Sequence, residues 1–315
     1  MNRALSEEHI ILIACQPRSG STLLQRLLAI HPEVATHAET WFLLDFLGTK
    51  DTHLTQSNFD NHLTQDALNE TISKIEGQTL HELNRNYVTS FYSALAGEHS
   101  YFLDKTPRYY EILPSINELL PKSPLLNLVR HPLNVLDSMI RTWIDKGAYL
   151  GNHYRDLCVA PRKITKHINS IENPIVLRYE DLVEDPLQAI SKLGERIGLD
   201  YSAVDLTLRS SNMVEGSMGD KSEFQKGEHV ISADSQAWRQ RLNDKKWKSF
   251  FVGYAHFLGR ESFEQFGYAY PNESKRTNVF DEFQYLGEKG LLQEDLSQKV
   301  KDKIKGKLKN LLSLV

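Results

Sequence analysis

The sequence is short of cysteine and of long apolar runs. Its 315 residues include only Cys15 and Cys158, too few for a framework of disulfides, so we expect two free thiols in a reducing compartment. The only apolar run near the N-terminus, Ile10–Cys15, is shorter than a signal-peptide core and much shorter than a membrane span. We therefore expect no membrane span and a cytoplasmic location.

Strong net charge is also absent. A formal charge of −4 gives no reason to expect a nucleic acid as partner. The sequence has no spacing of histidines, cysteines or carboxylates typical of a metal site, so we expect no metal. With 315 residues, of which 40% are hydrophobic, the chain is long enough for one large α/β domain or two small ones.

A strand, a tight turn and a helix are predicted in close succession near the N-terminus. Ile10–Cys15 is a β-branched apolar run, and leucines at helical spacing begin at Leu23. The N–H groups at a helix start lack partners within the helix, and its dipole favours negative charge there. The turn adds a cation, a flexible residue and hydroxyls: Arg18, Gly20, Ser21 and Thr22. This combination predicts a site for a phosphate-like or sulfate-like group.

The turn lacks the marks of a Walker-type nucleotide triphosphatase, G-x-x-x-x-G-K-[ST]. Ser21 stands between Gly20 and Thr22, where that motif has its lysine, and no earlier glycine opens the motif. The cation precedes the glycine instead, as Arg18. The lysine that binds the outer phosphates in triphosphatases is therefore missing.

Further short apolar segments alternate with helical patterns along the chain. The predicted strands after the first are Tyr101–Leu103, Leu125–Val129 and Pro174–Tyr179, and one of the predicted helices is Pro186–Ile197. This alternation predicts an α/β fold with a central parallel sheet flanked by helices. In such folds the ligand lies beyond the carboxyl ends of the strands. Four segments should share that edge: Gln16–Thr22, Asp104–Arg108, Arg130 and Tyr179–Asp181.

The turn resembles the 5′-phosphosulfate-binding loop of the sulfotransferases that use 3′-phosphoadenosine 5′-phosphosulfate (PAPS). It is most similar to the branch that writes this loop as R-S-G-[ST]-T, which includes tyrosylprotein sulfotransferases and bacterial sulfotransferase domains. The segment from Arg130 to Ser138 is similar to the family's 3′-phosphate-binding element, R-[DN]-P-x(5)-S. His131 replaces the usual Asp or Asn, and we expect it to be a turn residue.

The resemblance implies a P-loop-like sulfotransferase fold with PAPS as the cofactor and adenosine 3′,5′-bisphosphate (PAP) as its product. The cofactor-binding residues that it implies are Arg18, Ser19, Gly20, Ser21, Thr22, Leu23, Arg130 and Ser138. Tyr179 either packs near the adenine or is a core aromatic at a strand end. Ser235 is a further candidate for the 3′-phosphate, although the spacing here is S-x-x-W and the family has S-x-W.

The resemblance also implies catalytic residues. Matching Pro32–Thr40 to the same branch places Glu39 at the position of the catalytic base. His37 is the alternative base, because residues two apart on a strand face the same side. Lys105 matches the lysine of the family's K-[TD]-P segment, which reaches the transferring sulfuryl group. Arg18 is a second candidate to stabilise the leaving oxygen.

We therefore expect a sulfotransferase that moves the sulfuryl group of PAPS to an acceptor hydroxyl by in-line displacement. The acceptor we predict is an alcohol on an acyl chain held by a carrier protein, with free lipids, glycans and small metabolites as the alternatives. The alternatives are a P-loop-type phosphoryl transferase or kinase, and a non-catalytic nucleotide-binding module.

The predicted domains are a sulfotransferase domain over 1–270 and a linker with a Lys-rich helical tail over 271–315. Within the first domain, segments 51–97 and 210–235 are predicted to form the acceptor pocket or a lid.

Overall fold

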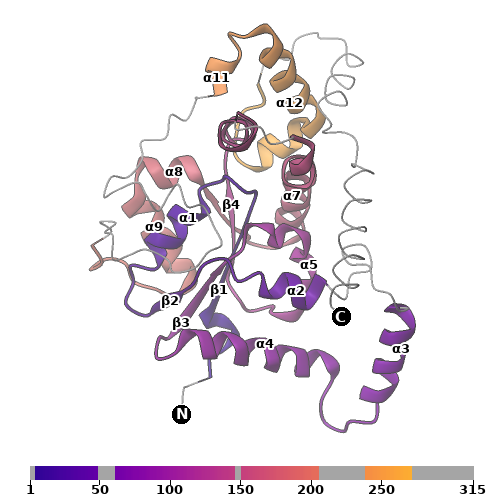
Figure 1. Ribbon diagram of the computed structural model, residues 1–315. Helices are drawn as coiled ribbons and strands as arrows, with labels where there is room; N and C mark the ends of the chain where they lie inside the picture. Colours follow the sequence, from indigo (N-terminus) through magenta and orange to yellow (C-terminus); the bar gives the residue numbers. More distant parts are fainter. Residues whose placement is uncertain (1–3, 49–60, 146–149, 206–237, 272–315) are drawn as a thin grey trace, which may run out of the picture. The chain divides into compact units, whose positions relative to one another are not determined.

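The computed structural model of the protein describes residues 4–48, 61–145, 150–205 and 238–271 (Figure 1). The predicted lid segment 210–235 and the predicted tail lie outside these residues. Two compact units divide the chain. The first consists of 1–130 and 166–233, and the second of 131–165 and 234–315. The expected division at residue 270 stays a prediction.

The first unit is built around a sheet of five parallel strands in the order β2-β3-β1-β4-β5. The strands are β1 (Ile10–Cys15), β2 (Val34–Thr36), β3 (Tyr101–Lys105), β4 (Leu125–Val129) and β5 (Ile175–Arg178). β1 is central, with Ile13 opposite Lys105 of β3 and Cys15 opposite Leu128 of β4. The predicted α/β fold with a parallel sheet is confirmed.

Helices accompany these strands along the chain. In the first unit they are η1 (Glu7–His9), α1 (Ser21–Leu28), α2 (Phe42–Gly48), α3 (Asn61–Ile72), α4 (Leu80–Ala96), η2 (Pro107–Glu111), α5 (Leu113–Leu119), α8 (Tyr179–Glu184) and α9 (Pro186–Ile197). The predicted helix Pro186–Ile197 has these bounds in the structure. Asp185 caps it by accepting from the Gln188 N–H at 3.0 Å, and Gly198 ends it in the left-handed region.

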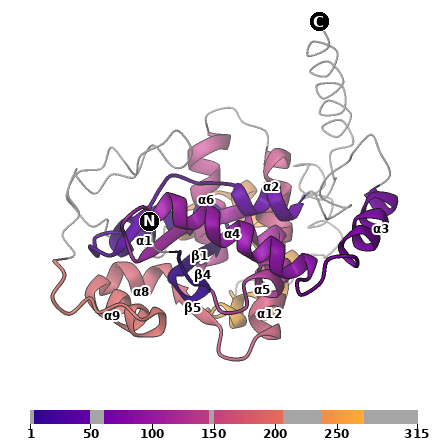
Figure 2. The same cartoon turned by 90° about the horizontal axis from the view of Figure 1, so that it is seen from below.

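Both faces of the sheet are covered. All six residues of β1 are buried, as expected for a central strand of a parallel sheet. On one face, Ile11 and Ile13 belong to a core cluster that includes residues of α1, α8 and α9. These three helices lie on the same side of the sheet in Figure 1, and Figure 2 shows α4 on the opposite side from α8 and α9. Because helices cover both faces of the sheet, we look for the site at its carboxyl edge.

The second unit is helical in its described part. It contains α6 (Pro132–Met139), the π-helical turns Ile140–Ile144 and Arg155–Val159, the 3-10 turn Leu150–His153, the start of α7 (Ala160–Ser170), α11 (Trp238–Arg241) and α12 (Lys245–Gln265). Gly259 kinks α12 with φ 77° and ψ 162°. The π-helical turn Arg155–Val159 leads directly into α7, so helical structure runs without a break from Arg155 to Ser170.

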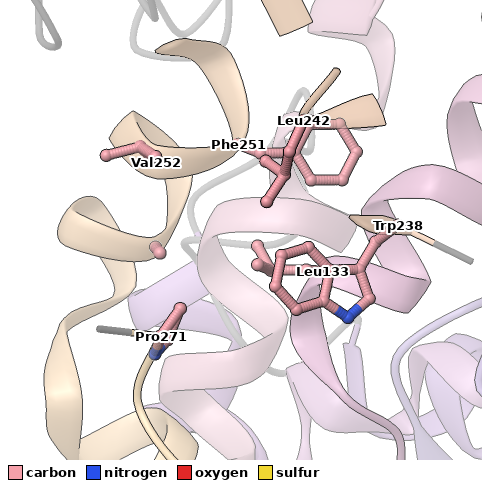
Figure 3. Close-up of a pocket in the computed structure, with 7 residues that line it drawn as sticks. Leu133, Trp238, Leu242, Phe251, Val252 and Pro271 are labelled. Carbon is pink, nitrogen blue, oxygen red and sulfur yellow. The ribbon is translucent and has the colours of Figure 1, made fainter. Parts of the chain in front are cut away.

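The second unit contains an apolar pocket and a network of ion pairs around one buried aspartate. Figure 3 shows the pocket, lined by Leu133, Trp238, Leu242, Phe251, Val252, Ala255 and Pro271. The buried carboxylate of Asp137 pairs with Arg241 and Arg141, each at 2.9 Å. Two arginines compensate for the cost of removing this charge from water.

Both cysteines are buried free thiols, as predicted. Burial raises the pKa of the Cys158 thiol to about 12, so this group is a poor nucleophile near neutral pH. Within the described residues, no helix is both long and apolar enough to cross a bilayer. The cytoplasmic location stays a prediction.

Candidate active site

The predicted site segments of the first unit meet at one edge of the sheet. Strands β1, β3, β4 and β5 are parallel, so the residues that follow them lie at the same carboxyl edge. These residues are Gln16–Thr22, Thr106–Arg108, Arg130 and Tyr179–Asp181. The shared edge predicted from the pattern is confirmed, except that Asp104 and Lys105 of the predicted segment Asp104–Arg108 still belong to β3.

The loop between β1 and α1 has an unusual backbone. Arg18 and Gly20 have φ angles of 73° and 91°, in the region that glycine tolerates and other residues seldom adopt. Gly20 is the N-cap of α1, so the first N–H groups of the helix face the loop without intrahelical partners. The Ser19 hydroxyl is buried and has no hydrogen-bond partner among the described residues. These features fit an anion that binds at the loop.

Tyr179 and Arg130 support the loop from two neighbouring strand ends. The Tyr179 ring lies directly against Gly20, where it occupies the space of a Cβ atom. The Arg130 guanidinium stacks over this ring at 4.3 Å, and its Nη1 donates to the Arg18 carbonyl at 2.9 Å. Tyr179 is buried in the core cluster, which agrees with its expectation as a core aromatic. Its contact with adenine stays a prediction.

Glu39 and Lys105 form an ion pair in which Lys105 is buried and Glu39 is partly buried. Lys105 Nζ donates to Glu39 Oε1 at 2.9 Å, and the two side chains are 2% and 14% exposed. The Trp41 indole Nε1–H donates to the other carboxylate oxygen, Oε2, at 3.2 Å. Removing two charges from water is costly, so a buried pair of this kind is weak evidence of a purely stabilising role.

Two local expectations about these residues were wrong. Lys105 does not follow a strand in a loop but is the last residue of β3, which extends two residues beyond the predicted Leu103. Glu39 and His37 do not share one side of a strand, because β2 ends at Thr36. His37 is exposed, and its backbone carbonyl accepts from Gln25 Nε2 at 2.6 Å. Glu39, not His37, is therefore the side chain paired with Lys105.

Asp104 is a site residue to which sequence reasoning gave no role. Its carboxylate is fully buried and accepts hydrogen bonds from four side-chain hydroxyls, those of Thr40, Tyr92, Thr106 and Tyr109. Burial raises the pKa of Asp104, and the four hydrogen bonds lower it in part. An aspartate directly before the predicted lysine was the only signal in the sequence, since the tyrosines come from other elements.

The segment that carries Glu39 is held in a strained turn. Trp41 has a φ angle of 55°, which for a bulky residue costs about 1–3 kcal/mol. Its backbone N–H donates to Thr106 Oγ1 at 3.3 Å, and the neighbouring Thr40 hydroxyl donates to Asp104 Oδ2 at 2.7 Å. Hydrogen bonds to β3 and to the residue after it thus compensate for the strain.

The remaining predicted site residues lie elsewhere. Arg130 follows β4 in the first unit and Ser138 lies on α6 in the second, so their joint contact with a 3′-phosphate stays a prediction. Ser235 lies outside the described residues. His131 caps α6, as its Nδ1 accepts from the Leu133 N–H at 3.3 Å, which agrees with a turn residue. No group of three or more metal-ligating side chains occurs in the part of the chain that the structure describes.

A parallel sheet whose central strand leads into a loop that suits an anion defines the class of protein: an α/β protein with its candidate site at the carboxyl edge of the sheet. Residues 11–203, more than half of the chain, match the sequence profile described as the sulfotransferase family. The chain belongs to this family, as the resemblance implied.

Two curated proteins resemble parts of the chain. Nodulation protein NoeE of Sinorhizobium fredii is 33% identical over 129 residues, which are 40% of this chain and 30% of that protein. The chain thus matches less than a third of the length of this relative. A protein of Caenorhabditis briggsae, provisionally named a protein-tyrosine sulfotransferase, is 24% identical over 200 residues, 62% of this chain and 67% of that protein.

Solved structures also show a distant likeness. The sulfotransferase domain from the curacin biosynthetic pathway is 19% identical with a TM-score of 0.46, covering 90% of this chain and 99% of that domain. The sulfotransferase domain of the Synechococcus PCC 7002 olefin synthase is 19% identical with a TM-score of 0.43, covering 76% of this chain and 90% of that domain. Scores this low support no conclusion about the site, so the assignment rests on the family match.

The contact between Gly20 and Tyr179 predicts that Gly20→Ala damages the loop. The added methyl group would overlap the ring at a φ of 91°, so we expect a loss of about 1–3 kcal/mol in the free energy of unfolding. Gly48→Ala is the matched control, since nothing lies within 4 Å of its added methyl group. Thermal denaturation of the two variants tests this, and equal melting temperatures would contradict it.

Proposed function

We propose that this chain transfers the sulfuryl group of PAPS to an acceptor hydroxyl by a single in-line displacement. The observation that carries the proposal is the largely enclosed ion pair of Glu39 and Lys105 in a sulfotransferase-family chain whose β1–α1 loop suits an anion. One bond forms, between the acceptor oxygen and sulfur. One bond breaks, between sulfur and the bridging oxygen of the 5′-phosphate, and the products are a sulfate ester and PAP.

The loop residues bind the donor in this proposal. PAPS supplies an activated sulfuryl group, and its 5′-phosphosulfate is expected at the loop formed by Arg18, Ser19, Gly20, Ser21, Thr22 and Leu23. The N–H groups at the start of α1 and the buried Ser19 hydroxyl provide the hydrogen-bond donors. Arg130 and Ser138 are proposed to bind the 3′-phosphate, with Ser235 as a further candidate.

Glu39 is the proposed general base. Its carboxylate takes the proton of the acceptor hydroxyl as the new bond to sulfur forms. Lys105 and Arg18 are proposed to stabilise the negative charge that develops on the leaving phosphate oxygen. The ion pair supports this assignment because it holds the base and a cation at hydrogen-bond distance, 2.9 Å, at a strand end.

Substitution of the base tests the mechanism most directly. Glu39→Gln keeps the size of the side chain but cannot accept a proton near neutral pH, so turnover should fall by about 100- to 10,000-fold. The affinity for PAP, measured by calorimetry, should stay nearly unchanged because the loop and Arg130 remain.

His37→Gln is the control for this substitution. His37 is exposed and is not the partner of Lys105, so its replacement should lower turnover by less than about tenfold. A severe loss in His37→Gln beside a mild loss in Glu39→Gln would instead make the histidine the base.

Substitution of Arg130 tests whether this residue binds the 3′-phosphate of the cofactor. Arg130 also donates a hydrogen bond to the Arg18 carbonyl, so Arg130→Ala should lower the affinity of every ligand that binds at the loop. The loss of binding free energy should be roughly 2–3 kcal/mol larger for PAP than for adenosine 5′-phosphosulfate. The second ligand has no 3′-phosphate and therefore no charge-assisted contact with Arg130 to lose. Equal losses for the two ligands in calorimetry would remove this role from Arg130.

Transfer of a radiolabelled sulfuryl group distinguishes the candidate activities. We expect turnover with ³⁵S-labelled PAPS in the absence of magnesium and none with labelled ATP. The reverse result would favour a phosphoryl transferase, and PAP binding without transfer to any acceptor would favour a binding module.

The acceptor we propose is an alcohol on an acyl chain held by a carrier protein. The support for it is the predicted Lys-rich helical tail over 271–315, whose positive charge would suit an acidic partner. A hydroxyacyl carrier protein, the same free hydroxy acid, a tyrosine peptide and an oligosaccharide form the panel for the radiolabel experiment. Labelling of the free acid or the peptide in preference to the carrier-bound acyl chain would overturn this choice.

A further inference from the structure

The carboxylate of Glu39 has a second hydrogen-bond partner that the proposed chemistry does not require. Lys105 binds Oε1, and the Trp41 indole N–H donates to Oε2 at 3.2 Å. The indole therefore fixes the rotation of the carboxylate about its own axis, which a single contact at the other oxygen would leave free. One of the two oxygens has to face the acceptor, so this rotation matters for proton transfer.

Trp41 can reach Glu39 only because its backbone takes an uncommon conformation. With a φ of 55°, the chain turns back and brings the indole to a carboxylate just two residues earlier. A bulky residue does not hold this conformation without support from its surroundings. Observed strain of this kind tends to occur where a side chain must be aimed.

The support comes from Asp104. Its Oδ2 accepts from the Thr40 hydroxyl at 2.7 Å, and the Phe42 N–H donates to the same hydroxyl at 3.2 Å. Its Oδ1 accepts from Thr106 Oγ1, which in turn accepts from the Trp41 N–H at 3.3 Å. The two oxygens of Asp104 thus hold the chain on both sides of the strained residue.

The same segment is fixed at its other end by α1. Gln25 is 1% exposed, and its Nε2 donates both to Thr36 Oγ1 at 2.7 Å and to the His37 carbonyl at 2.6 Å. Ala38 and Glu39 lie between these two anchors. The direction of the Glu39 side chain is thereby left to Lys105 and Trp41.

We propose that Trp41 is a positioning residue for the base Glu39 and that Asp104 locks the strained turn which aims it. The proposal rests on the proposed function, since it assumes that Glu39 is the base. It goes beyond that function in giving roles to Trp41 and Asp104, to which the proposed chemistry assigns none.

Trp41→Phe tests the contact itself, because it removes the indole N–H and keeps an aromatic ring. We expect turnover with labelled PAPS and the acceptor from the panel to fall about 10- to 100-fold, with PAP affinity and melting temperature nearly unchanged. Trp247→Phe removes the same atoms in α12 and is the matched control, with turnover within about twofold of wild type.

A double-mutant cycle distinguishes positioning from a general structural role. In a Glu39→Gln background, Trp41→Phe should lower turnover by less than about twofold, since there is no base left to aim. An equal loss in both backgrounds, or no loss in either, would overturn the positioning role. If Glu39→Gln alone leaves turnover intact, the base assignment fails instead, and the two failures remain distinguishable.

Two further variants test the lock. Thr40→Val keeps the shape of the side chain but loses the bond to Asp104, and it should reproduce the loss of turnover seen in Trp41→Phe. Thr40→Ser keeps the hydroxyl and should restore turnover to within about threefold of wild type. Equal activity in the two variants would remove Asp104 from the proposal.

Nuclear magnetic resonance gives a readout that does not depend on activity. The Trp41 indole N–H resonance should shift in Glu39→Gln, and its exchange with solvent should speed up in Thr40→Val but not in Thr40→Ser. An indole resonance that is indifferent to all three substitutions would overturn the proposed contact, even if turnover changed.

Discussion

Pairing of β1 with β3 on one side and with β4 on the other is the constraint on which the candidate site depends. All three strands are parallel, so the residues that follow them lie at the same edge of the sheet. The register of the strands is sufficient to bring these residues together. The register places Lys105 opposite Ile13, two residues before β1 gives way to the loop. A loop that suits an anion and a buried lysine thus become neighbours through backbone hydrogen bonds alone.

Electrostatics at this edge follows from burial. Lys105 is almost fully enclosed, and at low local dielectric its charge needs a partner, which Glu39 provides. Asp104, one residue earlier, is enclosed as completely and finds hydroxyl partners instead of a cation. Adjacent strand positions face opposite sides, which is why two buried charges can follow one another in the chain without sharing an environment.

The sequence was sufficient for the sheet and the loop because their signals are local. An apolar run before Gly20 and helical spacing after it determine a strand, a turn and a helix, and the structure has each of them. The order of the five strands follows less directly, since it depends on which helices cover which face. The end of β3 was misplaced because Asp104 and Lys105 are charged, and only tertiary partners make charged residues tolerable in a buried strand.

The parts of the site that sequence could not provide are those formed by distant side chains. Tyr92 on α4 and Tyr109 in η2 reach Asp104 only in the folded chain. Their spacing in the sequence does not predict these hydrogen bonds. The positive φ angle of Trp41 could not be predicted from the sequence either, because tryptophan has no preference for the left-handed region. The distinction between Glu39 and His37 depended on where β2 ends, and strand ends are the least certain feature of any sequence pattern.

The packing of the Tyr179 ring against Gly20 has a consequence for how this chain can diverge. The residue after β5 and the tightest point of the loop after β1 share one volume, although they lie far apart in the sequence. A larger side chain in the loop could be accommodated only if the ring became smaller, and a smaller ring would also withdraw the surface on which Arg130 stacks. We therefore expect substitutions at the ends of β4 and β5 and in the β1–α1 loop to be accepted together and not one at a time.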